Sequence, residues 1–226
     1  LWFSGSKSLD DFVIENKGRE SSQFANAGLF TIRGERSWAM VVSNNYSSRP
    51  GHMDQQHFDL WIEGVNVFCD SGTYSYASDE GRKLVRNESH NTAVVEGLPQ
   101  MNSSGPFMIF DWTKRELDKC NNNAYVGKCV SANGYEHIRE VKQIGASYEI
   151  TDTCNKDFQI LFHTPCIIEK NDKCYALKHN GKVLCTIESS SDCKLNKGKR
   201  SLYYLKKDVT TCLTIEGHEG TDIKTI

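Results

Sequence analysis

The feature that most constrains this chain is a long succession of short strand-like segments separated by turn residues. The segments are rich in Val, Ile, Thr, Tyr and Phe, and each is closed by Gly, Asn or Asp, as in "GLFTIRG" and "HFDLWIEG". The best helical candidate, "SDEGRKLVRNES", has room for only a turn or two. Regularly spaced short strands are typical of sandwiches and barrels. We therefore predict an all-β fold.

The composition changes after about residue 168, where Lys, Asn and Ser become more frequent and the predicted strands shorten. We expect residues 1–170 to form the core of the fold. Residues 171–226 are predicted to add further strands to the same sheets or to form a small appended β layer. The segment "SLYYLKK", residues 201–207, is one of the strands predicted there.

Charge and cysteine usage exclude some classes of function. A formal net charge of -2 over 226 residues gives no general reason to expect a nucleic-acid partner, and no apolar run reaches the length of a membrane span. The nine cysteines include no CxxC pair, which excludes zinc-finger chemistry and favours free thiols in a reducing, cytoplasmic compartment. The chain begins at Leu1 rather than Met, so we expect a processed product or a segment of a longer protein.

One alternating segment, "HFDLWIEGVNVFCD", predicts a β-hairpin that turns at Glu63–Gly64. A tight turn that pairs the residues on either side of it would place His57 opposite Asp70. The same register brings His52 to this end of the sheet, and His90, which opens the next predicted strand, can reach it.

Imidazole and carboxylate groups that converge at strand ends suit Zn²⁺, with a fourth position open to water. The residue spacing also fits an interpretation without a metal. Each histidine can be an ordinary hydrogen-bonded residue, and Asp70 before Ser71-Gly72 can make an Asx turn. Spacing alone leaves both interpretations open.

Three motifs in this region resemble the heparinase II/III-like family. They are "RPGHMDQQHFDLWIEG", "DSGTYSY" and "RNESHNTAVVEG", which match in order a His-x-Asp before a strand, an Asp-x-Gly-x-Tyr after the next, and a His-Asn-Thr that opens the third. The resemblance extends from about Phe24 to Ile168. It implies a large antiparallel two-layer β-sandwich that follows, in full-length members, an α-helical toroid absent from this chain.

The resemblance also implies a function. Such enzymes are polysaccharide lyases that cleave uronate-containing polysaccharides by β-elimination, with most catalytic residues in the toroid and a cleft between the two parts. The expected partners are therefore an acidic polysaccharide and the amino-terminal toroid. Family members are usually exported or periplasmic, which opposes the indication from the cysteines. Carried over residue by residue, the family's metal site, a structural zinc beside the cleft, falls on His52, Asp70 and His90.

The chain departs from the family at Pro50, where several members have a histidine that takes part in acid–base work. Proline has no proton to transfer, so no catalytic residue is assigned. The resemblance favours His52 over His57 as a ligand and leaves His57 as a rival or as a residue that orients one.

Four residues are candidates for binding the polysaccharide: Arg49, Tyr74, Tyr76 and Arg86. An arginine can bind a sugar carboxylate through two hydrogen bonds, although solvated or structural roles remain open for both arginines. The two tyrosines can also be ordinary packing residues whose hydroxyl groups are hydrated.

These observations leave three functional hypotheses. The first is the carboxy-terminal domain of a polysaccharide lyase, nearly inactive when isolated, because elimination needs a carboxylate neutraliser, a base and an acid held together. The alternative is a non-catalytic carbohydrate-binding or scaffolding sandwich. A metal-dependent hydrolase is less well supported, since Asp54 is the only obvious candidate for its base.

Overall fold

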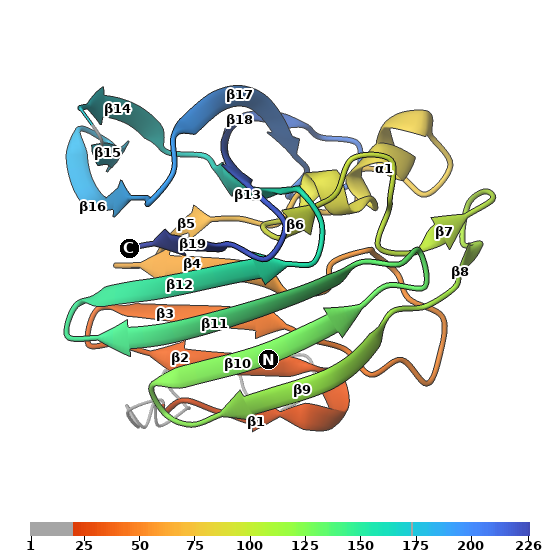
Figure 1. Ribbon diagram of the computed structural model, residues 1–226. Helices are drawn as coiled ribbons and strands as arrows, with labels where there is room; N and C mark the ends of the chain where they lie inside the picture. Colours follow the sequence, from red (N-terminus) through yellow and green to blue (C-terminus); the bar gives the residue numbers. More distant parts are fainter. Residues whose placement is uncertain (1–19, 173) are drawn as a thin grey trace, which may run out of the picture.

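Two five-stranded antiparallel sheets face each other in the computed structural model, which describes residues 20–172 and 174–226 (Figure 1). Their strand orders are β1-β2-β3-β4-β5 and β19-β12-β11-β10-β9. The first sheet contains β1 (Gln23–Phe24), β2 (Leu29–Arg33), β3 (Ser37–Val42), β4 (His57–Ile62) and β5 (Val65–Phe68). The second contains β9 (Lys114–Cys120), β10 (Ala124–Val130), β11 (Glu136–Ile144), β12 (Ser147–Cys154) and β19 (Asp222–Thr225).

A four-stranded and a three-stranded sheet lie with α1 along one side of this sandwich (Figure 1). A four-stranded sheet contains β17 (Cys193–Arg200), β18 (Asp208–Gly217), β13 (Phe158–Thr164) and β6 (Ala93–Val94). A three-stranded sheet contains β14 (Ile167–Asn171), β15 (Cys174–His179) and β16 (Lys182–Glu188), and a two-stranded one contains β7 (Asn102–Ser103) and β8 (Ile109–Phe110). The helical elements are α1 (Asp79–Leu84) and the 3-10 turns η2 (Ala25–Ala27) and η3 (Asn87–Ser89).

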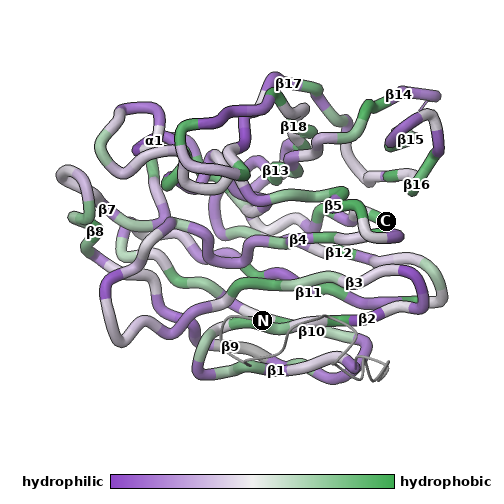
Figure 2. Tube along the Cα trace, turned by 180° about the vertical axis from the view of Figure 1, so that it is seen from behind, coloured by the Kyte–Doolittle hydropathy of each residue, from purple (hydrophilic) through white to green (hydrophobic). Residues whose placement is uncertain are grey.

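The core lies between the two large sheets because alternate side chains of each point inward. Rings from opposite sheets meet there: the centroids of Phe30 and Tyr125 are 5.2 Å apart, and those of Phe58 and Tyr148 are 6.3 Å apart. Figure 2 shows hydrophobic positions recurring along the strands of both sheets. The predicted all-β antiparallel sandwich is therefore confirmed.

The sequence prediction was wrong in two kinds of segment. Residues 201–207 form no strand beyond one bridge at Ser201, and Leu202, Tyr203, Tyr204 and Leu205 are 56–69% exposed. The polar strands β9 and β17 were missed, since only Gly198 of β17 is buried and no apolar alternation marks that strand.

The carboxy-terminal residues contribute to several sheets. β18 pairs with β13 along its length, β19 pairs with β12, and β15 and β16 belong to the small three-stranded sheet. The division at residue 170 stays a prediction.

All nine cysteines are free. In the described ranges, no helix has the length and apolar character needed to cross a bilayer.

Candidate metal centre and groove

The hairpin β4–β5 brings the polar cluster together, although by a different register from the predicted one. Its turn is tight, with φ of +49° at Glu63 and +80° at Gly64, and Ile62 pairs with Val65. Leu60 then pairs with Phe68, so a bulge shifts the register by one residue. Continuing the strand pairing therefore would not place His57 opposite Asp70.

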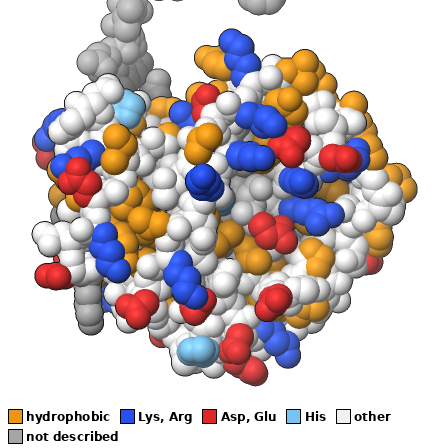
Figure 3. Space-filling view, turned by 90° about the horizontal axis from the view of Figure 1, so that it is seen from above, with side chains coloured by type: hydrophobic (Ala, Val, Ile, Leu, Met, Phe, Trp, Pro, Cys, Tyr) orange, Lys and Arg blue, Asp and Glu red, His pale blue; other side chains and the backbone are white. Residues whose placement is uncertain are grey.

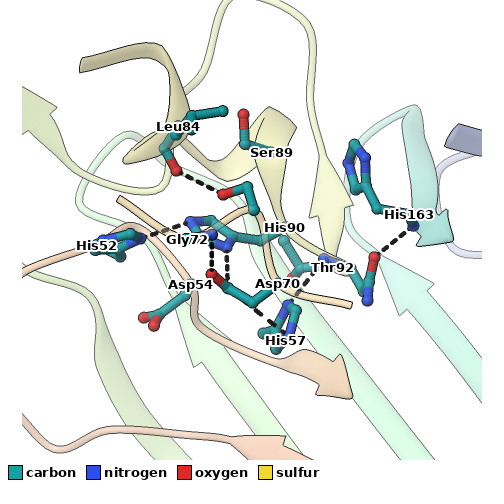
Figure 4. Close-up of polar contacts among 12 residues, drawn as sticks. His52, Asp54, His57, Asp70, Gly72, Leu84, Ser89, His90, Thr92 and His163 are labelled. Carbon is teal, nitrogen blue, oxygen red and sulfur yellow. Dashed lines mark hydrogen bonds and ion pairs between the residues drawn. The ribbon is translucent and has the colours of Figure 1, made fainter. Parts of the chain in front are cut away.

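His52, Asp70 and His90 converge from three separate segments (Figure 4). His52 lies in the loop before β4, Asp70 follows β5, and His90 follows η3. His52 Nδ1 is 3.4 Å from His90 Nε2, and His90 Nδ1 is 2.8 Å from Asp70 Oδ2. One ligand atom from each residue can be chosen so that all three lie within 4.8 Å of one another. The structure thus brings together all three predicted ligands.

This geometry fits a zinc ion. Two nitrogens bound to a tetrahedral Zn²⁺ at about 2.0–2.1 Å lie roughly 3.3 Å apart, close to the 3.4 Å between the His52 and His90 nitrogens. The other oxygen of Asp70 accepts the Gly72 backbone N–H at 2.6 Å. Asp70 Oδ2 thus holds the His90 ring with Nε2 directed at His52, and to serve as the third ligand Asp70 would exchange this hydrogen bond for the ion.

The electrostatics favour a neutral His52 beside an ionised Asp70. Burial lowers the pKa of His52, and the charge of His90 lowers it further. Burial also opposes charge on His90 and Asp70, but their mutual attraction and hydrogen bond outweigh it. As a result, the pKa of His90 is raised and that of Asp70 lies well below its usual range. His52 therefore needs no deprotonation before it binds a metal.

His57 lies behind the three predicted ligands, where its side chain is 2% exposed. Its Nδ1 accepts the backbone N–H of Asn91 at 3.0 Å, which places its proton on Nε2. That nitrogen is 3.9 Å from Asp70 Oδ2 and also 3.9 Å from Asp59 Oδ2. Both distances exceed hydrogen-bond length, so His57 contributes a proton-bearing nitrogen directed at Asp70 rather than a ligand facing His52.

His52 also lines a groove of about 750 Å³, whereas His90 is fully buried. The groove lies between the loop that carries His52, the helix α1 and the loop between β7 and β8. Its other lining residues include Arg49, Tyr76, Arg82, Lys83, Arg86 and Phe107. Lysine and arginine side chains gather near the centre of the face that Figure 3 shows, which looks down on this side of the molecule.

Three of the four predicted polysaccharide-binding residues line this groove: Arg49, Tyr76 and Arg86. Tyr74 does not; it is half-buried, and Lys207 Nζ lies 4.8 Å from the centre of its ring. Pro50 is buried, and Asp54 accepts a long hydrogen bond from Tyr46 Oη at 3.4 Å.

Sequence reasoning missed two cations on α1, Arg82 and Lys83, and the ring of Phe107, which lies 5.1 Å from the Arg49 guanidinium carbon and 5.3 Å from the Tyr76 ring. Their signal was weak, because "GRK" looks like any solvated turn and Phe107 was assigned to a strand.

Comparison with known proteins now supports the earlier resemblance. The sequence model for the heparinase II/III-like C-terminal domain matches residues 16–226, which is nearly the whole chain. The chain belongs to the heparinase II/III-like family. The match extends past the stretch that the three motifs cover and includes the carboxy-terminal strands.

Among curated heparinase II/III-like relatives, a heparin-sulfate lyase from Bacteroides stercoris is 28% identical over 135 residues, covering 57% of this chain and 20% of that protein. Among solved structures, a heparinase III superposes with a TM-score of 0.74 at 17% identity, over 91% of this chain and 35% of that one. Heparan sulfate lyase HepC from Pedobacter heparinus gives 0.71 at 16% identity, over 93% and 36%. The chain thus spans about a third or less of these relatives, and the solved structures show the fold.

Proposed function

We propose that this chain is the carboxy-terminal domain of a polysaccharide lyase that acts by β-elimination on uronate-containing polysaccharides. The observation that carries the proposal is that His52, one of three converging side chains that could hold a metal ion, forms part of the wall of a groove that is also lined by four cations. A polyanionic chain is the ligand that such a wall favours, because the cations lie close together along one hollow.

The four cations are not equivalent. Arg82 pairs with Asp79, and Lys83 lies 3.7 Å from Glu80, so the acids of α1 offset part of their charge. Within residues 20–172 and 174–226, no carboxylate lies within ion-pair distance of Arg49 or Arg86. Both are exposed. These two arginines are therefore the groups we assign to the uronate carboxylate, which must be neutralised before its neighbouring proton can leave.

Zinc in this proposal has a structural role. His52, His90 and Asp70 would hold it, and bound there it would cross-link the loop before β4, the end of β5 and the segment after η3. The chain's own residues then keep the groove wall in place, with Arg49 and Arg86 binding the sugar acid and Tyr76 and Phe107 offering exposed rings for a sugar face.

The base and acid of the elimination are expected in the remainder of the full-length protein, by analogy with the toroid of the family. Appearance of the unsaturated uronate product, followed by ultraviolet absorbance, tests this on heparan, chondroitin, hyaluronan and alginate. Full-length protein should cleave at least one of them, and residues 1–226 alone should cleave none. Comparable rates from the isolated segment would contradict the assignment of the base and the acid to the remainder of the full-length protein.

The groove residues have their own test in the full-length protein. Arg49→Ala and Arg86→Ala should each raise KM more than they lower kcat, since each removes a contact to bound substrate. Lys178→Ala, on β15 and paired with Glu169, is the matched control and should leave both constants unchanged. Unchanged KM in both arginine variants would exclude these residues from substrate binding.

One observation favours a second candidate function, a carbohydrate-binding or scaffolding sandwich without catalysis. Pro50 occupies the place where the family resemblance puts an acid–base histidine, while the groove is lined by cations and aromatic rings that suit a sugar acid. This alternative predicts that the full-length protein binds an acidic polysaccharide in a pull-down or by calorimetry and releases no unsaturated product.

A further inference from the structure

Asn91, the residue after His90, ties together the strands on which the proposed zinc ligands depend. Its side chain is 0% exposed and makes three hydrogen bonds. Its Nδ2 donates to the carbonyls of Phe58 at 2.8 Å and Cys69 at 3.3 Å, and its Oδ1 accepts the backbone N–H of His163 at 2.6 Å. Because Cys69 precedes Asp70, one amide fixes the segment of Asp70 relative to that of His90.

Arg139 supports the same region from inside the sandwich. It is among the largest fully buried side chains of the described residues, and it binds Asp152 through two hydrogen bonds of 2.7 and 3.0 Å. Its Nη1 group donates to the main chain, 2.5 Å from the carbonyl oxygen of Gln56 and 2.6 Å from that of Asn91.

The two carbonyls belong to the segments that carry the histidines. Gln56 has a φ of +61°, a left-handed conformation that is unfavourable without glycine, in the turn between His52 and β4. Its backbone N–H donates to Val42 at 2.7 Å, and the Tyr125 hydroxyl holds its side chain at 2.8 Å. A buried cation on the carbonyl of this turn therefore fixes the end of the loop in which His52 lies.

We propose that Asn91 and Arg139 are positioning residues for the metal centre: they set the spacing between His52, Asp70 and His90. Neither contacts the place where an ion would be held. They act through the main-chain carbonyls of Gln56, Cys69 and Asn91. The inference rests on the zinc site of the proposed function, and it identifies which residues preorganise that site.

Zinc affinity, measured by competition with a chelating dye on the folded chain, tests the proposal. Asn91→Ser removes both donors and should weaken zinc binding roughly 10–100-fold, the usual cost of losing a partner that orients a ligand. Arg139→Lys keeps the charge but, with three donors on one nitrogen in place of a planar fork, cannot make all four hydrogen bonds of Arg139, and should weaken binding in the same direction. Replacement of zinc by Co²⁺ adds a spectroscopic measure, because a change in the visible absorption of either variant reports altered ligand geometry.

The control is Leu177→Ala, a cavity in a 0% exposed position on β15, at the opposite end of the molecule from α1 (Figure 1). It should lower the urea midpoint of unfolding and change zinc affinity less than twofold. If wild-type protein binds no zinc, the proposed metal site fails. If wild-type binds zinc and Asn91→Ser and Arg139→Lys retain its affinity and cobalt spectrum, or lose affinity only as much as Leu177→Ala does, positioning is refuted. Should Asn91→Ser not fold, Arg139→Lys decides between these outcomes.

Discussion

Two groups of side chains in this molecule each contain a hydrogen bond between an aspartate and a histidine, one group in the interior and the other beside the groove. In the interior group, Asp152 accepts hydrogen bonds from His137 at 2.7 Å and from Arg139, and the His137, Arg139 and Asp152 side chains are all 0–1% exposed. In the group at the groove, Asp70 binds His90, but the Asp70 side chain is 39% exposed and His52 borders open space.

The difference lies in how many partners each group already has. The interior carboxylate is saturated by a cation and an imidazole, as a buried charge must be. At the groove, two imidazole nitrogens face each other at 3.4 Å, a long distance for a hydrogen bond and a suitable one for a shared ion. Histidine and aspartate residues therefore do not identify a binding site by their type alone. Nitrogen and oxygen atoms that lack a full set of hydrogen-bond partners and lie next to a groove are the better indication.

Removal of one carboxylate from each group should separate stability from metal binding. Asp152→Asn leaves Arg139 buried without its counter-ion and should lower the unfolding free energy by roughly 3–5 kcal/mol in metal-free protein. Asp70→Asn breaks one partly exposed pair and should cost about 1 kcal/mol, yet abolish the gain in unfolding free energy that added zinc is expected to produce. Urea unfolding with and without zinc measures both. Equal stability losses would break the comparison.

Acid should destabilise the protein through another histidine, His163, whose backbone N–H donates to the Asn91 side chain. Burial, and after it the charge of His90, lowers the pKa of His163 to about 4. Unfolded His163 has a pKa near 6.5, so between these values the unfolded state binds the extra proton and stability falls as the pH falls. The contribution is complete above about pH 6.5 and amounts to about 3 kcal/mol across the interval.

Urea unfolding at a series of pH values, compared between wild type and His163→Gln, isolates this contribution. The variant should show a shallower loss of stability between about pH 6.5 and pH 4. Parallel curves for the two proteins would show that folding leaves the pKa of His163 unchanged and would contradict this prediction.

Much of the fold could be predicted from the sequence, because strands such as β10 and β12 alternate buried and partly exposed residues along their length. β17 could not, since it packs mainly through its backbone pairing with β18. Residues 201–207 were wrongly predicted as a strand because the segment is rich in tyrosine and leucine. These side chains are exposed to solvent instead of packing in a sheet.

Some residues of the candidate site could likewise be predicted from the sequence, and others could not. His52, Asp70 and His90 could be predicted because the family motifs carry them. Asn91 and Arg139 were missed, since they act through carbonyl groups, which leave no pattern of side-chain types. One signal was present: Arg139 shares its strand face with His137 and Val141, both of which are buried, and an arginine on an inward face requires a partner such as Asp152, directly opposite on β12.

The most direct test of this account is the zinc content and affinity of the purified chain, determined by elemental analysis and dye competition. Wild type should hold about one zinc ion per chain, and His52→Ala and His90→Ala should each weaken binding by roughly 100-fold or more, since each loses a ligand rather than an orienting partner. His218→Ala, whose side chain is 82% exposed beside Asp157, should bind zinc as wild type does. Unchanged zinc content in both ligand variants would contradict the metal centre.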